Sequence, residues 1–146
     1  MATLERAIEI ARQAHAGQVD KAGADYIGHP LRVMEMGETE DEKIVGILHD
    51  VIEDSNWTFE MLEAEGFSLN VIEALRCLTK LSVNESYEEF IDRVLTNELA
   101  RLVKLNDLMD NMDLRRISEP NDKDIQRVEK YKDAYNKIRE HNPYAL

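Results

Sequence analysis

Apolar residues recur at helical spacing along most of the chain. The first such run extends from Leu4 to Ala14 and predicts a helix that ends near Gly17. The stretch from residue 18 to residue 28 contains two glycines and has no sustained period, so it predicts a loop.

Two further helices are predicted between residues 29 and 54. His29 and Pro30 open the first of them, with His29 expected as its cap residue, and it should end near Gly37. The acidic sequence ETEDE, residues 38–42, suits the first turn of the next helix because negative charge complements the helix dipole. This second helix should run through the sequence HDVIED and end before residue 55.

The remaining sequence continues the same helical pattern. Helices are predicted over residues 58–65, 68–81, 87–95, 98–117 and 122–140. The last of these should turn its apolar side chains toward the core, namely Ile125, Val128, Tyr131, Tyr135 and Ile138. No segment alternates apolar and polar residues as a strand does. The sequence therefore predicts an all-α fold, a compact single-domain bundle of about eight helices over residues 1–146.

Charge and composition narrow the classes of partner. Eighteen Lys and Arg against thirty Asp and Glu give a net charge of −12, which repels nucleic acid polymers and anionic membrane surfaces. A small phosphorylated molecule stays compatible, because local cations act within a Debye length of about 8 Å. Cys77, the one cysteine, has no partner for an internal disulfide, and no apolar run is long enough for a membrane span. We expect a soluble, cytoplasmic protein and leave its oligomeric state open.

The sequence HDVIED, residues 49–54, is the strongest chemical signal. It places one imidazole and three carboxylates in an otherwise apolar run, and burying such groups is costly unless they are paired or bind a metal. On one helix, residues four apart share a face, so His49 would lie over Glu53 and Asp50 over Asp54. The segment predicts part of a metal-dependent hydrolytic site.

Two other segments carry groups that complement it. His29 lies between the glycine-containing loop and a helix start. In VKLNDLMDNM, residues 103–112, the side chains of Lys104, Asp107 and Asn111 fall on one helical face. Two imidazoles with two carboxylates suit Mn²⁺, Fe²⁺ or Zn²⁺ and leave positions open for water and a phosphate oxygen.

These residues carry a resemblance to a known family. The order of His29, the His49-Asp50 pair and Asp107 resembles the H…HD…D signature of the HD-domain metal-dependent phosphohydrolases. The blocks HAGQVDKAGADYIGHP (15–30), LHDVIEDS (48–55), LTKL (78–81) and VKLNDLMDNM more closely resemble the hydrolase domain of RelA/SpoT-type alarmone enzymes and the small alarmone hydrolases. The resemblance implies an all-helical HD-domain fold and removal of the 3′-pyrophosphate from guanosine tetra- or pentaphosphate. No synthetase domain follows here, so we expect a degradative role alone.

The resemblance also implies roles for individual residues. The implied metal ligands are His29, His49, Asp50 and Asp107. Glu53 and Asp54 match the acidic pair that orients and deprotonates the attacking water. The residues expected near the phosphates or the nucleoside are Lys21, Lys80, Lys104 and Asn111. Tyr26, beside His29 in the loop, is a further candidate for stacking on a base. One divalent ion is implied, Mn²⁺ first, with Zn²⁺, Fe²⁺ or Ni²⁺ as alternatives.

Several positions depart from the family pattern. Asp20 precedes Lys21 where the family usually has an Arg that stacks on the guanine, and aspartate cannot stack on a base. An Arg and a His usual in the third segment are replaced by Leu108 and Asp110, which lowers the positive charge expected there. A related phosphorylated small molecule therefore remains an alternative substrate. A general HD-type nucleotidase or phosphodiesterase, and a nucleotide sensor without turnover, remain alternative functions.

Overall fold

The computed structural model describes residues 2–80 and 82–141. Within these ranges the chain forms nine α-helices and one 3-10 helix, with an isolated antiparallel bridge between Val19 and Asp25. The helices are α1 (Leu4–Ala14), α2 (Gly28–Met36), α3 (Glu40–Leu48), α4 (Val51–Asp54), α5 (Phe59–Glu65), α6 (Leu69–Leu78), α7 (Tyr87–Leu95), α8 (Glu98–Asn111), η1 (Leu114–Arg116) and α9 (Asp122–Glu140). The all-α prediction is confirmed.

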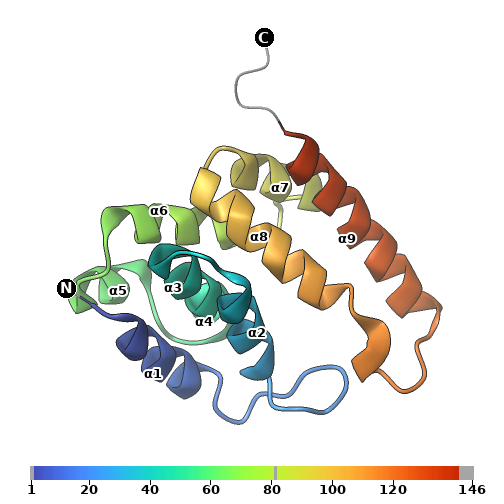
Figure 1. Ribbon diagram of the computed structural model, residues 1–146, viewed down its shortest axis with the longest axis horizontal. Coiled ribbons are helices and arrows are strands. Elements are labelled where there is room, and N and C mark those ends of the chain that lie inside the picture. The colour runs from blue at the N-terminus through green and yellow to red at the C-terminus, as the bar shows by residue number, and fades with distance from the viewer. Residues whose placement is uncertain (1, 81, 142–146) are drawn as a thin grey trace.

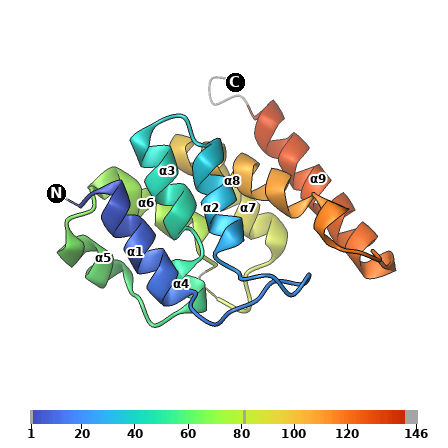
Figure 2. The ribbon, with the colours of Figure 1, turned by 60° about the horizontal axis from the view of Figure 1, so that its bottom comes forward.

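Helices α3 and α8 organise the arrangement. Helix α3 packs against α1, α2, α6 and α8, and α8 in turn packs against α9. Figure 1 shows α8 between the α2–α3 pair and α9, while α1 and α5 lie at the end of the molecule away from α9. From the second viewpoint, α2 and α3 again lie side by side (Figure 2). Among the described helices, none combines the length and the apolar character that a membrane span requires.

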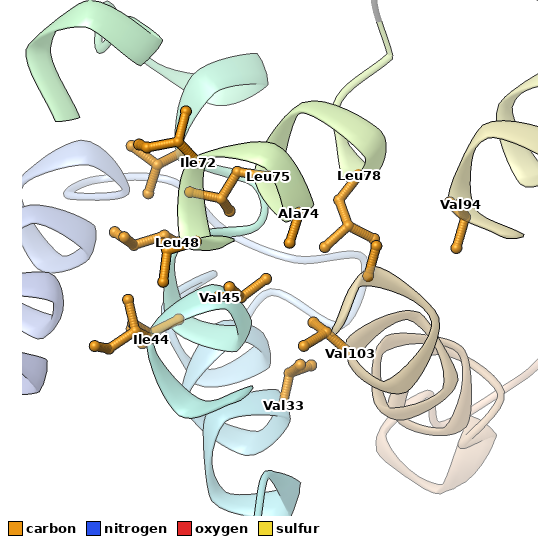
Figure 3. Close-up of a cluster of buried hydrophobic side chains, with 14 of the residues drawn as sticks. Val33, Ile44, Val45, Leu48, Ile72, Ala74, Leu75, Leu78, Val94 and Val103 are labelled. Carbon is orange, nitrogen blue, oxygen red and sulfur yellow. The ribbon is translucent and has the colours of Figure 1, made fainter. Parts of the chain in front are cut away.

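The core forms where the apolar faces of these helices meet. Figure 3 shows side chains of α3 facing those of α6, with Val33 of α2 and Val103 of α8 beside them. The apolar run of α3 is almost wholly enclosed, since Val45, Ile47 and Leu48 have no exposed surface. Burial of this run anchors the end of α3, from which His49 follows directly.

A glycine allows α2 and α3 to approach closely. A Cβ atom added at Gly46 would lie 3.2 Å from both the Cα and the backbone N of Met34. Because these are backbone atoms of a neighbouring helix, they cannot turn aside as a flexible side chain would. The close approach matters for function, because His29 lies on α2 and His49 lies at the end of α3.

Local capping fixes several helix starts. Thr39, Ser86 and Asn121 begin α3, α7 and α9 with capping boxes, in which the cap side chain and the residue three positions later exchange hydrogen bonds with each other's backbone N–H. Gly66 ends α5 in the left-handed region, with φ of 99°. These signals are local in sequence, and the predicted limits of α7 and α9 agree with the observed ones.

The prediction of one uninterrupted helix through HDVIED is wrong. Helix α3 ends at Leu48, and α4 begins only at Val51, after Asp50 with φ of −106° and ψ of 0°. The interruption leaves His49 buried, while Glu53 and Asp54 lie at the surface. The two halves of the motif therefore have different environments.

Other predicted boundaries also change. His29 is not a cap residue, because Ile27 is the N-cap of α2 and His29 is buried in the first turn. The helix predicted over residues 98–117 ends at Asn111 and is followed by η1. Ile125, predicted to face the core, is 48% exposed, while Ala134 and Ile138 supply the buried face of α9. The helix predicted over residues 68–81 ends at Leu78, with Thr79 as its C-cap, and residue 81 lies outside the described residues.

Candidate metal centre and adjoining cavity

The four residues predicted as metal ligands meet in the folded chain. His29 comes from α2, His49 and Asp50 from the break between α3 and α4, and Asp107 from α8. The Nε2 atoms of His29 and His49 lie 2.8 Å and 3.2 Å from the same Oδ1 atom of Asp107. Asp50 Oδ2 lies 3.1 Å from His49 Nε2 and 3.9 Å from His29 Nε2. Side chains from three segments of the chain therefore lie together, with Asp107 in contact with both imidazoles.

The two histidines present their Nε2 atoms because their Nδ1 atoms are engaged elsewhere. His49 Nδ1 donates to the backbone oxygen of Gly46 at 2.6 Å, since a carbonyl can only accept. His29 Nδ1 lies 2.6 Å from Asp110 Oδ2. With a proton held on each Nδ1, Nε2 is the nitrogen of each ring that can bind a metal once its own proton is lost.

Donor type and spacing fit a divalent ion. Ligand bonds of roughly 2.0–2.2 Å put adjacent donor atoms about 3 Å apart. His29, His49 and Asp50 place one donor atom each within 4.8 Å of the others, and the Nε2 and Oδ2 atoms of His49 and Asp50 lie 3.1 Å apart. Asp107 adds a carboxylate in contact with both imidazoles. The set of two nitrogen and two oxygen donors matches the hard-to-borderline divalent ions.

Buried opposite charges hold the carboxylates ionised. Burial alone would raise the pKa of Asp107, but the ammonium of Lys104 and the imidazole of His49 hold it well below the usual range. Lys104 Nζ lies 2.7 Å from Asp107 Oδ2, and Asn111 Nδ2 donates to Asp107 Oδ1 at 3.0 Å. Lys104, Asp107 and Asn111 therefore share one face of α8 as predicted, and Lys104 and Asn111 both contact Asp107.

Glu53 and Asp54 lie beside this centre with access to solvent. Desolvation is the largest cause that raises the pKa of each, and the nearby Asp50 carboxylate adds to it. Glu53 Oε1 accepts a hydrogen bond from the backbone N of Lys80. Gln18 Nε2 donates to the backbone oxygen of Asp54 at 2.8 Å, which ties the loop to the end of α4. Two carboxylates of raised pKa thus border the predicted ligands.

A cavity of about 400 Å³ adjoins the centre. It lies between the loop after α1, the C-terminal end of α8, η1 and α9, which approach one another at one end of the molecule (Figure 1). Its lining residues are Val19, Asp20, Lys21, Ala22, Tyr26, His29, Arg32, Asn111, Asp113, Arg116, Ile117, Arg127 and Tyr131. His29 belongs both to this wall and to the cluster of predicted ligands, so the two features are continuous.

The predicted substrate-binding residues divide into two groups. Lys21, Tyr26 and Asn111 line the cavity, and the Tyr26 hydroxyl also donates to Asp50 Oδ2. Lys104 is buried against Asp107 and does not line the cavity. Lys80 is exposed and also lies outside the lining, although its backbone N contacts Glu53.

Three arginines in the lining were missed from the sequence. Arg32 lies one turn after His29 on α2, Arg116 lies in η1, and Arg127 lies on α9. Together with Lys21 they bring cationic side chains to the cavity, where Arg32 and Arg116 pair with Asp110 and Arg127 pairs with Asp124. Arg32 could have been found from the sequence, because it lies three residues after His29 and residues three apart share a helical face. Nothing local marks Arg116 or Arg127.

The carboxylate of Asp20 has a structural role in the loop. Its Oδ1 atom accepts hydrogen bonds from the backbone N atoms of Ala22 and Ala24 at 2.9 Å and 3.0 Å. Gly23 completes this turn with φ of 85°, a conformation that glycine adopts without strain. Asp20 therefore fixes the backbone on which Lys21 is carried.

Comparisons with known proteins point to one group. The chain matches no protein-family model. A guanosine-3′,5′-bis(diphosphate) 3′-pyrophosphohydrolase of Aquifex aeolicus (strain VF5) is 32% identical over 120 residues, which is 75% of this chain and 17% of the relative. The bifunctional (p)ppGpp synthase/hydrolase SpoT of Escherichia coli (strain K12) is 31% identical over 123 residues, which is also 75% of this chain and 17% of the relative. The chain thus spans about one sixth of the length of these relatives.

A solved structure extends the comparison to the whole fold. It belongs to a metazoan orthologue of SpoT that is described as hydrolysing ppGpp and playing a role in starvation responses. The similarity has a TM-score of 0.80 at 22% identity and covers 98% of this chain and 89% of that chain. The two proteins therefore share a fold.

Proposed function

Because the chain is homologous to one region of the RelA/SpoT-type alarmone enzymes, we propose that it is a metal-dependent pyrophosphohydrolase of phosphorylated nucleotides. Its proposed reaction removes the 3′-pyrophosphate from guanosine tetra- or pentaphosphate. The observation that carries the proposal is the meeting of His29, His49, Asp50 and Asp107 beside a cavity with four cationic side chains.

The four clustered residues would hold one divalent ion. Mn²⁺ is the first expectation, and Zn²⁺, Fe²⁺ and Ni²⁺ are the alternatives. An ion bound there supplies Lewis acidity that lowers the pKa of water toward about 7 and polarises a phosphoryl oxygen. Tyr26 holds the Asp50 carboxylate through its hydroxyl, and Lys104 with Asn111 holds that of Asp107.

Glu53 and Asp54 are the proposed proton acceptors. Each borders the ligand cluster, so each can, when deprotonated, orient a water molecule and take its proton. Glu53 is held in place by the backbone N of Lys80, and Gln18 holds the backbone of Asp54. This arrangement gives Lys80 a positioning role through its backbone, independent of its side chain.

The cationic wall would receive the phosphates. Lys21, Arg32, Arg116 and Arg127 approach the cavity from the loop, α2, η1 and α9. Arginine suits phosphate because its guanidinium donates two parallel hydrogen bonds. Tyr131, also in the lining, and Tyr26 offer aromatic surface for the nucleoside. A compact polyphosphorylated nucleotide matches this mixture of charge and aromatic surface.

The raised pKa values of Glu53 and Asp54 predict the acidic limit of activity. A general base works only when deprotonated, so kcat/KM should fall as pH decreases through the raised pKa of these groups. The fall should therefore begin at higher pH than for ordinary carboxylates, whose pKa is about 4. The measurement is a pH profile of pyrophosphate release at saturating Mn²⁺.

Loss of the ion at low pH would give a similar profile, because histidine ligands must be deprotonated to bind it. Calorimetric titration with Mn²⁺ over the same pH range separates the two causes. If kcat/KM fell only where Mn²⁺ binding fell, the carboxylate assignment would be contradicted.

The function is tested by incubating the purified protein with Mn²⁺ and guanosine tetraphosphate while detecting pyrophosphate and orthophosphate separately. A panel of other nucleotides is run in parallel. Pyrophosphate release supports the proposal. Orthophosphate or a linear monophosphate from another substrate would instead indicate an HD-type nucleotidase or phosphodiesterase. Tight binding of guanosine tetraphosphate without any product would indicate a sensor.

A further inference from the structure

Asp110 lies behind the metal centre and is almost completely enclosed. It belongs to α8, one turn after Asp107, and only 3% of its surface is exposed. Its Oδ2 atom lies 2.6 Å from Nδ1 of His29, on the side of the imidazole opposite the predicted metal. A buried carboxylate at this distance accepts the Nδ1 proton.

Two arginines hold Asp110 in turn. Arg32 Nε donates to Asp110 Oδ1 at 2.7 Å, and Arg116 Nη2 donates to the backbone oxygen of Asp110 at 3.1 Å. Weaker contacts at 3.5 Å join the Arg116 guanidinium to both carboxylate oxygens. The carboxylate is therefore restrained from α2 and from η1 at once.

This geometry determines which imidazole nitrogen can bind an ion. If Asp110 keeps the proton on Nδ1, the lone pair of His29 stays on Nε2, which faces Asp50 and Asp107. Without a carboxylate there, nothing prevents the proton from moving to Nε2, and the ring is free to turn. Partners of this kind typically contribute 10- to 100-fold to metal affinity or activity.

We propose that Asp110 is a positioning residue that orients His29 toward the metal, and that Arg32 and Arg116 keep Asp110 in place for this role. The inference rests on the proposed function, because it assumes that His29 binds a metal. It also gives a purpose to the aspartate at a position where the sequence comparison had suggested only a loss of positive charge.

The first test compares two aspartate variants by calorimetric titration of the metal-free protein with Mn²⁺. Asp110→Asn replaces the carboxylate that faces His29 with a neutral amide, a weaker acceptor for the Nδ1 proton, and should weaken Mn²⁺ binding about 10- to 100-fold. Asp113→Asn removes an equal charge that also contacts Arg116, whereas the carboxylates that contact His29 are those of Asp50, Asp107 and Asp110. The affinity of Asp113→Asn for Mn²⁺ should stay within about threefold of wild type, because a partly exposed charge is screened.

Arg32→Gln separates positioning from simple electrostatics. Removing a cation near a cation site should strengthen Mn²⁺ binding if only charge matters. If Arg32 acts by holding Asp110, the same change should weaken Mn²⁺ binding several-fold. Because Arg32 is partly exposed, we expect its replacement to leave the fold intact. Circular dichroism of the metal-free variants checks that each is folded. The visible absorption of bound Co²⁺ provides a second readout, because it changes when a ligand is displaced or turned.

The outcomes distinguish this inference from the proposed function. Equal Mn²⁺ affinities for Asp110→Asn and Asp113→Asn, with an unchanged Co²⁺ spectrum, would overturn the positioning role while leaving the metal centre intact. Tighter binding by Arg32→Gln would overturn the role of that arginine. A wild-type protein that binds no divalent ion would overturn both proposals.

Discussion

Replacement of Asp50 by alanine is expected to remove both divalent-ion binding and pyrophosphate release. The change deletes a proposed ligand, and it also leaves the hydroxyl of Tyr26 and the imidazole of His49 without their carboxylate partner. Glu53→Gln should instead leave metal binding unchanged, because Glu53 lies outside the ligand cluster. We expect Glu53→Gln to bind Mn²⁺ normally and to lose about 10²- to 10⁴-fold in kcat, the usual contribution of a general base.

Calorimetric Mn²⁺ titration and pyrophosphate release, measured on the same samples, check both expectations. Glu53→Gln is a suitable comparison because the amide oxygen of glutamine still accepts the hydrogen bond from Lys80. Full activity of Asp50→Ala would refute the proposed mechanism. Loss of Mn²⁺ binding by Glu53→Gln would instead move Glu53 from proton acceptor to ligand.

The second large effect concerns stability. Lys104→Met should lower the free energy of unfolding of the metal-free protein by about 3 kcal/mol, because it leaves the buried Asp107 carboxylate without its ammonium partner. Burial by itself would lower the pKa of Lys104, and Asp107 raises it, so the lysine is charged in the folded protein. Methionine keeps an unbranched apolar side chain in place of the lysine stem and removes the charged group. That group lies 5.1 Å from the centre of the Phe90 ring.

Urea unfolding in the presence of a chelator measures this effect. The matched control is the double variant Lys104→Met/Asp107→Asn, which removes both charges. Its destabilisation should be smaller than the sum of the two single effects, because neither charge is then left alone. Strict additivity would mean that Lys104 and Asp107 do not stabilise each other, contrary to their 2.7 Å contact.

Local signals explain which helix limits could be predicted. Ser86 and Asn121 supply capping boxes, and the predicted starts of α7 and α9 are correct. The interruption at Asp50 has no such signal, since neither glycine nor proline lies there. At the interruption, the Asp50 carboxylate accepts a hydrogen bond from Tyr26 in a distant loop, which is a tertiary contact. Contacts of this kind cannot be inferred from periodicity.

The residues that could be singled out from the sequence are of distinctive types, and those that were missed are of common types. Two histidines and two aspartates in a recognisable order predicted a cluster that the structure brings together, although their role as metal ligands stays a prediction. Arg127 lies on the polar face of α9, where an arginine normally faces solvent. Lys104 was expected near substrate, but its burial depends on Asp107 and the packing of Phe90, and lysine is seldom buried.

The connection from α8 through η1 to α9 joins the part of the site that is synthesised first to the part that is synthesised last. All the proposed ligands lie before residue 112, whereas Arg127 and Tyr131 lie on α9. Because the ribosome makes a chain from its N-terminus, α2, α3 and α8 emerge before α9 does. The proposed ligands therefore all leave the ribosome before the α9 wall of the substrate cavity does.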